Sequence, residues 1–190
     1  MKYWRNIVNF PFAWPFIIIY ILSSKRVIVN RDIEAWERVN NPNISSIRNY
    51  SKTFYSKFIS YPEFRSLFYY RIGKWIKLIS WMYKGQDHLV FDCPEIGGGF
   101  YIQHGYCTDI SARHIGSNCW INQKVTIGYK GTSCPWIGDN VRIGVGAIII
   151  GDVTIGNDAK IGAGAVVVKD VPAGALAACQ PANNITKCNE

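Results

Sequence analysis

Two of the chain's three histidines, His104 and His114, lie ten residues apart in the stretch IQHGYCTDISARHIG, which begins at Ile102. An imidazole, with an ordinary pKa of about 6.5, can take a proton from a hydroxyl in one step and return it to a leaving group in the next. Two histidines could also bind zinc, but a zinc site needs at least three protein ligands, and the third histidine, His88, lies outside this stretch. The stretch therefore favours acid–base chemistry, and no metal is expected.

These histidines lie within a six-residue repeat of aliphatic residues. The repeated residues are Ile96, Ile102, Ile115, Ile121, Ile127, Ile137, Ile143, Ile149, Ile155, Ile161 and Val167. A unit this short cannot bury its own side chain, so successive turns must stack and share one hydrophobic column. Six is a multiple of the strand period of two, and the glycine that follows most of these residues permits a tight bend. The pattern predicts a parallel β-helix with three hexapeptide turns in each coil.

Two insertions interrupt the repeat. One extra residue enters between Ile102 and Ile115, and four enter between Ile127 and Ile137, in the segment GYKGTSCPW. Insertions in a solenoid emerge as outer loops and often carry function. His104 stands beside the first insertion. His114 directly precedes an aliphatic residue of the repeat, which predicts an exposed side chain on the outer face of a turn.

The hexapeptides and their order resemble a known family. The segments IGGGFYIQHG, INQKVTIGYKG and IGDNVRIGVGAIIIGDVTIGNDAKIGAGAVVVKDVP are similar to the serine acetyltransferase-like branch of the left-handed β-helix acyltransferases. Within it they are most similar to acetyltransferases of capsule and exopolysaccharide clusters, including the colanic acid type. The resemblance covers residues 91–182. It implies a left-handed parallel β-helix, acetyl-CoA as co-substrate and a homotrimer.

The resemblance also implies a catalytic base. The family's base is a histidine just before a glycine or alanine, and His104 stands in that place. It would take the proton of an acceptor hydroxyl as that oxygen attacks the thioester carbonyl of acetyl-CoA. In the serine enzymes a carboxylate 15 residues earlier orients this base, but Leu89 stands there in this chain. Asp92 is the nearest candidate, with Glu95 behind it, and the choice stays open.

Further residues are implied to bind acetyl-CoA. Pantetheine would lie in the groove between two β-helices of a trimer, along the main chain at Gly146 and Ala147 and at Gly164 and Ala165, although the coil itself also needs small residues there. Lys169 is implied to contact phosphate, as a compact point charge.

The acceptor side departs from the serine enzymes. Gln103 replaces an aspartate, and Ser133-Cys134 replaces an Arg-His pair that would grip the ammonium and carboxylate of serine. Asp109 could touch the acceptor or cap its own turn. Cys134 could act as a thiol relay, but direct transfer is the family mechanism. We therefore expect transfer to a sugar hydroxyl of a capsular or exopolysaccharide unit. The alternatives are a serine O-acetyltransferase of cysteine biosynthesis and an inactive membrane-bound β-helix scaffold.

Composition divides the chain near residue 90. Residues 1–92 hold 14 of the 21 Lys and Arg residues and 21 of the 27 aromatic residues, and they carry the whole net charge of +8. We expect a basic, aromatic α-helical region over 1–90, the β-helix over 91–175 and a C-terminal tail over 176–190. The basic residues form no recognisable nucleic-acid reading module, so no nucleic acid is expected.

The N-terminal segment is the best candidate for membrane contact. The run FPFAWPFIIIYIL, residues 10–22, contains two prolines and is shorter than the roughly 20 residues that a spanning helix needs. Lys and Arg residues flank it on both sides, which favours association of residues 1–26 with a membrane surface. The six cysteines contain no CxxC pair, and no convincing signal peptide is visible, so we expect a cytoplasmic protein at the inner face of the cytoplasmic membrane.

The other helices expected in this region are amphipathic. The spacing predicts a helix over 62–84 with Trp75 on its apolar face and Arg71 on its basic face, and a preceding helix that includes Ile44 and Ile47. The apolar face of the 62–84 helix could pack on the protein core or lie on an anionic membrane.

Overall fold

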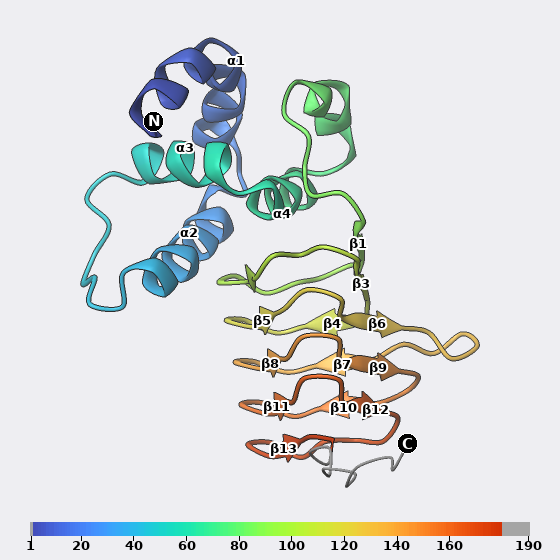
Figure 1. Cartoon of the computed structure of the whole chain (residues 1–190). Helices are drawn as coiled ribbons and strands as arrows, with labels where there is room; N and C mark the ends of the chain where they lie inside the picture. Colours follow the sequence, from blue (N-terminus) through green and yellow to red (C-terminus); the bar gives the residue numbers. More distant parts are fainter. Residues whose placement is uncertain (1, 180–190) are drawn as a thin grey trace, which may run out of the picture.

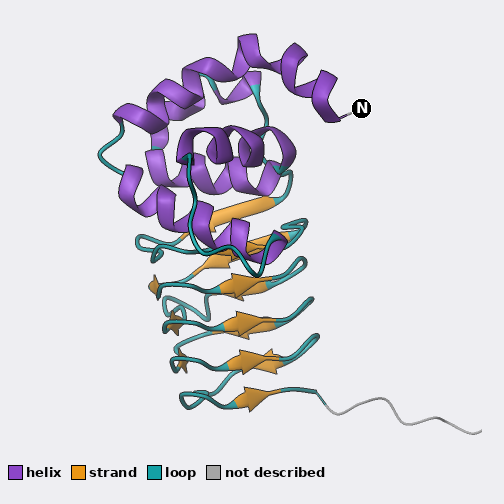
Figure 2. Ribbon diagram, turned by 90° about the vertical axis from the view of Figure 1, so that its left-hand side faces the viewer, coloured by secondary structure: helices purple, strands orange, loops and turns teal. Residues whose placement is uncertain are grey.

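The computed structural model describes residues 2–179, with side chains from residue 12 onward, so residues 180–190 of the expected tail lie outside the described residues. Helices gather at one end of the molecule, and a stack of β-coils forms the rest (Figures 1 and 2). The helices are α1 (Lys2–Leu22), α2 (Arg26–Asn40), α3 (Tyr50–Ser60) and α4 (Pro62–Ile72), followed by the 3₁₀ helices η1 (Lys74–Leu78) and η2 (Ser80–Met82).

The coils are built from short strands in three parallel sheets. Sheet A contains β1 (Leu89–Asp92), β3 (Thr108–Ser111), β6 (Thr126–Gly128), β9 (Ile148–Ile150) and β12 (Val166–Val167). Sheet B contains β4 (His114–Ile115), β7 (Trp136–Ile137) and β10 (Thr154–Ile155). Sheet C contains β2 (Tyr101–Ile102), β5 (Trp120–Ile121), β8 (Arg142–Ile143), β11 (Lys160–Ile161) and β13 (Leu176–Ala177). The chain visits the sheets in the order C, A, B, which confirms the predicted parallel β-helix. Strand β13 lies within the range expected for the tail.

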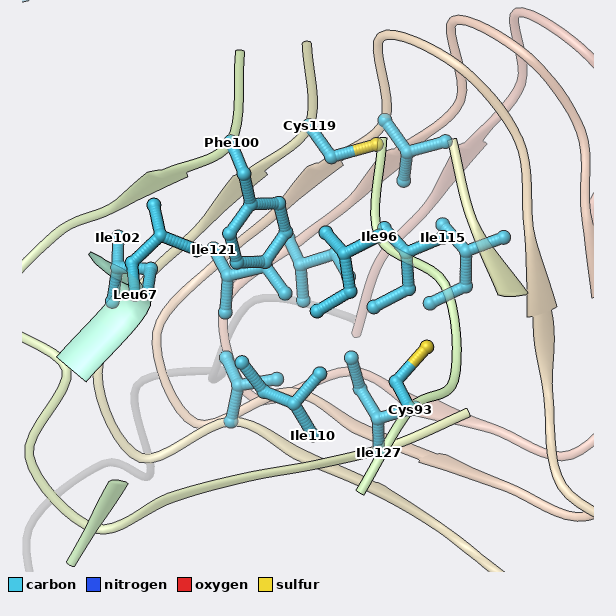
Figure 3. Packing of buried hydrophobic residues seen from close by; sticks show 14 of the residues in the cluster. Leu67, Cys93, Ile96, Phe100, Ile102, Ile110, Ile115, Cys119, Ile121 and Ile127 are labelled. Atoms are coloured by element: carbon cyan, nitrogen blue, oxygen red, sulfur yellow. The ribbon is translucent and has the colours of Figure 1, made fainter. Parts of the chain in front are cut away.

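The aliphatic residues of the repeat form columns inside the coil. On sheet C, Ile102 pairs with Ile121, which pairs with Ile143. Each is at most 1% exposed, and Figure 3 shows such residues of successive coils pointing into the interior of the coil. Every turn thus buries its side chain only because the next turn covers it.

The first insertion is larger than the sequence indicates. Ile110 faces inward from sheet A and follows Ile102 by eight positions, and Ile115 follows Ile110 by only five. The turn after Ile102 is therefore two residues longer than a regular hexapeptide turn, and the next turn is one shorter. His104 lies within this longer turn.

The single helix expected over 62–84 is wrong. The α-helix ends at Ile72, because Gly73 takes φ +101°, a value that an L-residue side chain disfavours and that ends the helical path. The 3₁₀ helices that follow repeat every three residues, so the faces rotate. Trp75, after the break, is consequently 54% exposed. Arg71, before it, is 7% exposed because its guanidinium pairs with the buried Asp32 of α2.

The preceding helix begins later than expected. It starts at Tyr50, where the Asn49 side chain caps it by accepting a hydrogen bond from the main-chain N–H of Lys52 at 3.0 Å. Ile44 and Ile47 therefore lie in the connection before the helix.

The N-terminal helix passes through both of its prolines and is partly a core element. Ala13, Phe16 and Tyr20 are fully buried in the helical region. Among the described residues no single helix is long and apolar enough to cross a membrane. The pair Phe12–Leu22 and Arg26–Asn40 passes that test of length and composition only when taken together across a 117° bend.

A buried ion pair fixes the helices to the first coil. The Arg71 guanidinium on α4 donates to the Asp32 carboxylate on α2, with a closest N–O distance of 2.9 Å. The Trp36 indole N–H donates to the carbonyl of Phe100 in the coil at 3.0 Å. These contacts hold the first turn of α4, which carries Glu63, against the turn that contains His104.

Candidate active site

The residues expected to form a site lie along the two edges of sheet A. We call the turns from sheet C to sheet A the glycine corner (residues 103–107, 122–125, 144–147 and 162–165). We call the turns from sheet A to sheet B the loop corner (residues 93–95, 112–113, 129–135, 151–153 and 168–170). His104 and the glycine–alanine pairs lie on the glycine corner. Asp92, Cys134 and Lys169 lie at or beside the loop corner.

His104 stands on the bulged turn at the top of the glycine corner. Its side chain is exposed and its backbone has φ +66°, a left-handed conformation that is costly for a residue other than glycine. Such conformations persist where the surroundings enforce them and are frequent at functional sites. The next residue, Gly105, has φ +44°, and a Cβ there would come within 3.2 Å of the Cβ of Glu63. Glycine at this place therefore lets α4 approach the turn.

Glu63 is the carboxylate that contacts the His104 segment. Its carboxylate lies near the main-chain N–H of His104, which acts to lower its pKa, and Glu63 is 7% exposed. Burial raises the pKa of Glu63 above its ordinary value, while the nearby His104 acts in the opposite direction. Sequence reasoning missed this residue because it lies 41 positions before His104 in a helix. The only local signal is an acidic residue just after Pro62 at a helix start.

Asp92 is not brought to His104 within one chain. Strand β1 begins at Leu89, which lies beside Gly105, and Asp92 lies three residues farther along, about 10 Å for an extended strand. The Asp92 side chain is exposed, and its Oδ2 accepts a hydrogen bond from the Tyr129 hydroxyl at 3.1 Å. In a single copy of the chain, Glu63 therefore lies nearer to the His104 turn than Asp92 does.

The glycine corner below His104 exposes bare main chain. Gly146 and Gly164 have φ +69° and +66°, and a Cβ added to either would meet no atom within 4 Å. Their outer side is open, so a slender ligand could approach the backbone there. Ala147 and Ala165 are 0% and 3% exposed and point into the coil. The two alanines can therefore contact a ligand only through their main chain.

The loop corner carries the longest insertion. In Figure 1 the loop between β6 and β7 extends away from the stack of coils. Cys134 at the end of this loop is 5% exposed, so its thiol is not presented as a surface nucleophile. Lys169, which follows β12, is exposed. One copy of the chain places Lys169 across the width of sheet A from the glycine corner.

The other polar candidates have local partners. The main-chain N–H of Gln103 donates to the carbonyl of Ile121 at 2.8 Å, and its side chain is half-buried. Asp109 lies on sheet A, is exposed, and accepts a hydrogen bond from the Ser111 hydroxyl at 2.8 Å. This contact fits the local structural role that the sequence left open for Asp109.

His114 lies apart from His104 on the outer face of sheet B. Its ring stacks on Trp136 with centroids 5.3 Å apart, and its Nδ1 lies 3.5 Å from Glu95. The side chain is 30% exposed, so the prediction of a fully outward residue is only partly met. Among residues 2–179 no group of three or more His, Cys, Asp or Glu side chains could hold a metal ion.

A groove of about 1050 Å³ lies on the outer face of sheet C. Tyr101, Trp120, Arg142 and Lys160 lie side by side along it, and Arg38 of α2 borders it. The Tyr101 and Trp120 rings are 4.8 Å apart, and the Arg142 guanidinium lies 5.5 Å from the Trp120 ring centroid. No carboxylate of the described chain lies within 4.0 Å of Arg142 or Lys160.

Comparison with known proteins shows which families this geometry resembles. Residues 134–169 match the family described as bacterial transferase hexapeptide (six repeats). This match covers part of the coil, so the chain is similar to the hexapeptide-repeat transferases over these residues. Hexapeptide repeats imply that the coil is left-handed, as the resemblance to the β-helix acyltransferases implied.

Curated relatives share part of the coil. The chain is 42% identical over 64 residues to a protein of Escherichia coli K12 named as a candidate colanic acid biosynthesis acetyltransferase, WcaB, covering 32% of this chain and 40% of the relative. It is 40% identical over 98 residues to a serine acetyltransferase of Helicobacter pylori, covering 49% of this chain and 57% of the relative. The chain thus spans about half the length of the curated relatives it matches.

A solved structure extends the likeness of this hexapeptide-repeat protein to the helical region. A serine acetyltransferase in complex with CoA has a TM-score of 0.64 and 26% sequence identity, over 87% of this chain and 71% of that chain. The shared fold therefore includes both the helices and the coils.

Proposed function

We propose that the protein is an acetyl-CoA-dependent O-acetyltransferase that transfers acetyl to a sugar hydroxyl of a capsular or exopolysaccharide unit, with His104 as general base. One observation carries the proposal: His104 stands exposed at the head of the glycine corner, directly in line with the bare main chain at Gly146 and Gly164. A base and a slot for a slender thioester are thus on one edge of the coil. Relatives named acetyltransferases and a neighbour solved with CoA support the choice of substrate.

In this mechanism His104 accepts the proton of the acceptor hydroxyl while the hydroxyl oxygen attacks the thioester carbonyl. When the tetrahedral intermediate breaks its carbon–sulfur bond, the imidazolium returns the proton to the departing thiolate, so free CoA and the acetyl ester result. Glu63, which lies beside this turn, would support the main chain of His104. The peptide groups at Gly146 and Gly164, beside Ala147 and Ala165, would hold the pantetheine.

A homotrimer would complete the site. Asp92, Cys134 and Lys169 lie at the opposite edge of sheet A from His104, so they would reach the site only from a neighbouring copy. In a closed trimer, the glycine corner of one copy would meet the loop corner of the next. This arrangement turns the outer face of sheet A toward the three-fold axis. That face is suitably apolar, since Val90 and Val166 are 50% and 63% exposed there. Lys169 of the neighbour would then contact a CoA phosphate, and Gln103 and Asp109 would border the acceptor.

The groove on sheet C supports a glycan acceptor. Aromatic rings such as Tyr101 and Trp120 can stack on the apolar face of a sugar ring, because their negative faces attract its polarised C–H groups. Arg142 and Lys160, which form no ion pair among the described residues, suit an acidic sugar. A chain of sugars lying in this groove could present a hydroxyl to His104, since Tyr101 is only three residues away. A single amino acid would not use such a groove.

The acceptor experiment follows thiol release from acetyl-CoA with L-serine and with a panel of oligosaccharides. Sugar-dependent release is expected. Robust turnover with serine, the alternative that the solved neighbours favour, would contradict the sugar assignment. No turnover with any acceptor, together with no binding of CoA, would favour the inactive scaffold.

Trp120→Ala is expected to raise KM for an oligosaccharide acceptor about tenfold and to leave kcat within about twofold. An aromatic stacking contact is worth about 1.4 kcal/mol, which corresponds to a factor of ten. Steady-state kinetics at saturating acetyl-CoA measure this. Trp136→Ala, on the outer face of sheet B, is the matched control and should change neither constant. An unchanged KM in the Trp120 variant would remove the groove from the acceptor site.

Glu63→Gln is expected to change how stability depends on pH. Burial raises the pKa of Glu63 in the folded protein above the ordinary value of 4.5. The contribution of this group to stability is therefore fully present below about pH 4.5 and is lost as the pH rises through the folded pKa. The glutamine side chain does not titrate in this range. The free energy of unfolding of the variant minus that of wild type should therefore increase from pH 4.5 toward neutral. Urea unfolding across this range tests the sign, and a decreasing difference would contradict it.

Peripheral association with the inner face of the cytoplasmic membrane is the remaining part of the proposal. The α1 helix buries Phe16 but exposes Phe12, Trp14 and Leu22 at 58%, 53% and 78%. Basic residues Lys25 and Arg26 follow directly, and the combination suits an anionic membrane surface. This supports the expectation for residues 1–26 with one addition: the same helix is needed for the core, so its removal would also disturb the fold.

A further inference from the structure

The 3₁₀ segment after α4 exposes three large apolar side chains that the fold does not use. Trp75, Leu78 and Trp81 are 54%, 79% and 73% exposed. They are spaced by three residues, and residues three apart are eclipsed along a 3₁₀ helix. Trp75 and Leu78 thus share one face of η1, and Trp81 continues the spacing in η2. We call these three residues the tryptophan ridge.

The ridge is not an exposed part of the face that packs on the core. The same segment already has an inward face: Ile76 is 1% exposed, and Ile79 and Met82 pack against the core. Gly73 ends α4 and turns Trp75 outward, away from the apolar face on which a continuous helix would have placed it. Three adjacent large apolar side chains left in water indicate an interaction surface.

The charges around the ridge identify the partner. From Phe64 to Gln86 the chain contains five basic residues and no Asp or Glu. Lys74, Lys77 and Lys84 are exposed, and no carboxylate of the described chain lies within 4.0 Å of them. Tryptophan is enriched where a membrane meets water, and each lysine near an anionic surface adds about 1 kcal/mol of attraction. The combination of Trp, Leu and unpaired Lys matches an anionic lipid surface.

The ridge lies at the same end of the molecule as α1. The green 3₁₀ segment and the blue α1 helix both occupy the end farthest from β13 in Figure 1, and Figure 2 shows the helices gathered at that end. Phe16 of α1 contacts Tyr83, just after η2, with ring centroids 6.1 Å apart. A membrane at this end would leave the coils and His104 in water.

We propose that the tryptophan ridge inserts into the interfacial layer of a membrane that contains anionic lipids, with Lys74 and Lys77 at the headgroups. This deepens the membrane-association part of the proposed function by naming a second contact surface beside α1. It does not depend on the acetyl-transfer chemistry.

The test uses the full chain with vesicles of phosphatidylcholine and phosphatidylglycerol in equal amounts, and with phosphatidylcholine alone. Wild type should sediment with the mixed vesicles, and added salt should weaken its binding. The triple variant W75S/L78S/W81S should bind at least about tenfold more weakly. A tenfold loss corresponds to about 1.4 kcal/mol, which is a small loss for the removal of three large apolar side chains. Lys74→Ala with Lys77→Ala should reduce the dependence on salt. Trp136→Ser, on sheet B, should bind as wild type does.

Two results would overturn the proposal. In the first, the ridge variant binds the mixed vesicles as strongly as wild type, which would leave α1 as the only contact. In the second, wild type ignores vesicles but forms a larger species that the ridge variant does not form, which would make the ridge a contact between proteins. Thiol release with a soluble acceptor, measured on the same samples, separates this proposal from the enzymatic one. The ridge variant should retain that activity, and its retention also shows that the variant is folded.

Discussion

Replacing His104 by alanine is expected to lower kcat for acetyl transfer by about 10²- to 10⁴-fold, the usual contribution of a general base. The imidazole stands exposed at the head of the glycine corner, on the same edge of the coil as the open main chain of Gly146 and Gly164. Binding of CoA should stay within about twofold of wild type, because the proposed CoA contacts are peptide groups several turns away. Thiol-release kinetics and calorimetric titration with CoA measure the two effects separately.

His114→Ala provides the matched control for this prediction. It removes the same ring from the outer face of sheet B, where His114 stacks on Trp136. Its kcat should stay close to that of wild type. Equal losses in both variants would mean that the His104 effect is structural, and a His104 variant with nearly full activity would remove the general-base role.

The architecture of the coil was predictable because its signal is periodic. An aliphatic residue every six positions does not return to one face of an α-helix, so the period favours the stacked turns of a β-helix. The paired residues of successive coils, such as Ile121 with Ile143, have this arrangement. The register of the bulged turn was less predictable. The sequence shows only a net excess of one residue between Ile102 and Ile115. The inward-facing Ile110 shows that the turn before it is two residues longer than a hexapeptide turn and the turn after it is one shorter.

The partner of His104 could not be found in this way. The family pattern directs attention to the preceding coil, where Asp92 was the available acid, but a strand fixes distances along its own length and Asp92 lies too far along β1. Glu63 reaches the turn from α4, and no repeat or spacing relates a helix to a coil 41 residues later. Tertiary packing alone brings them together, through Gly105.

The helical region was harder to predict for a related reason. One glycine, Gly73, decides whether residues 74–82 continue the face of α4 or turn away from it. A helical pattern read through Gly73 places Trp75 in the core and Arg71 in water, and the structure has the opposite arrangement. The reversal has consequences at both sites, because Trp75 becomes part of the tryptophan ridge and Arg71 becomes part of the junction that supports Glu63.

Asp32→Ala is expected to destabilise the protein by about 3–5 kcal/mol, the usual effect of removing one partner of a buried ion pair. Asp32 is 1% exposed. Its carboxylate accepts hydrogen bonds from Nε and Nη2 of Arg71 at 2.9 and 3.1 Å and from the main-chain N–H groups of Gly99 and Phe100, each at 2.9 Å. Alanine would leave a buried guanidinium and two buried N–H groups without this acceptor. Urea unfolding, followed by circular dichroism, measures the change.

Asp152→Ala is the control for the same type of substitution. The Arg113–Asp152 pair is as short, at 2.7 Å, but its side chains are 51% and 65% exposed, so its loss should cost at most about 1 kcal/mol. The Asp32 variant should also lose kcat at temperatures where it is still folded, because Arg71 lies on α4, the helix that brings Glu63 to His104. A stable Asp32 variant, or a folded one with full activity, would show that the helical region reaches the catalytic turn without this ion pair.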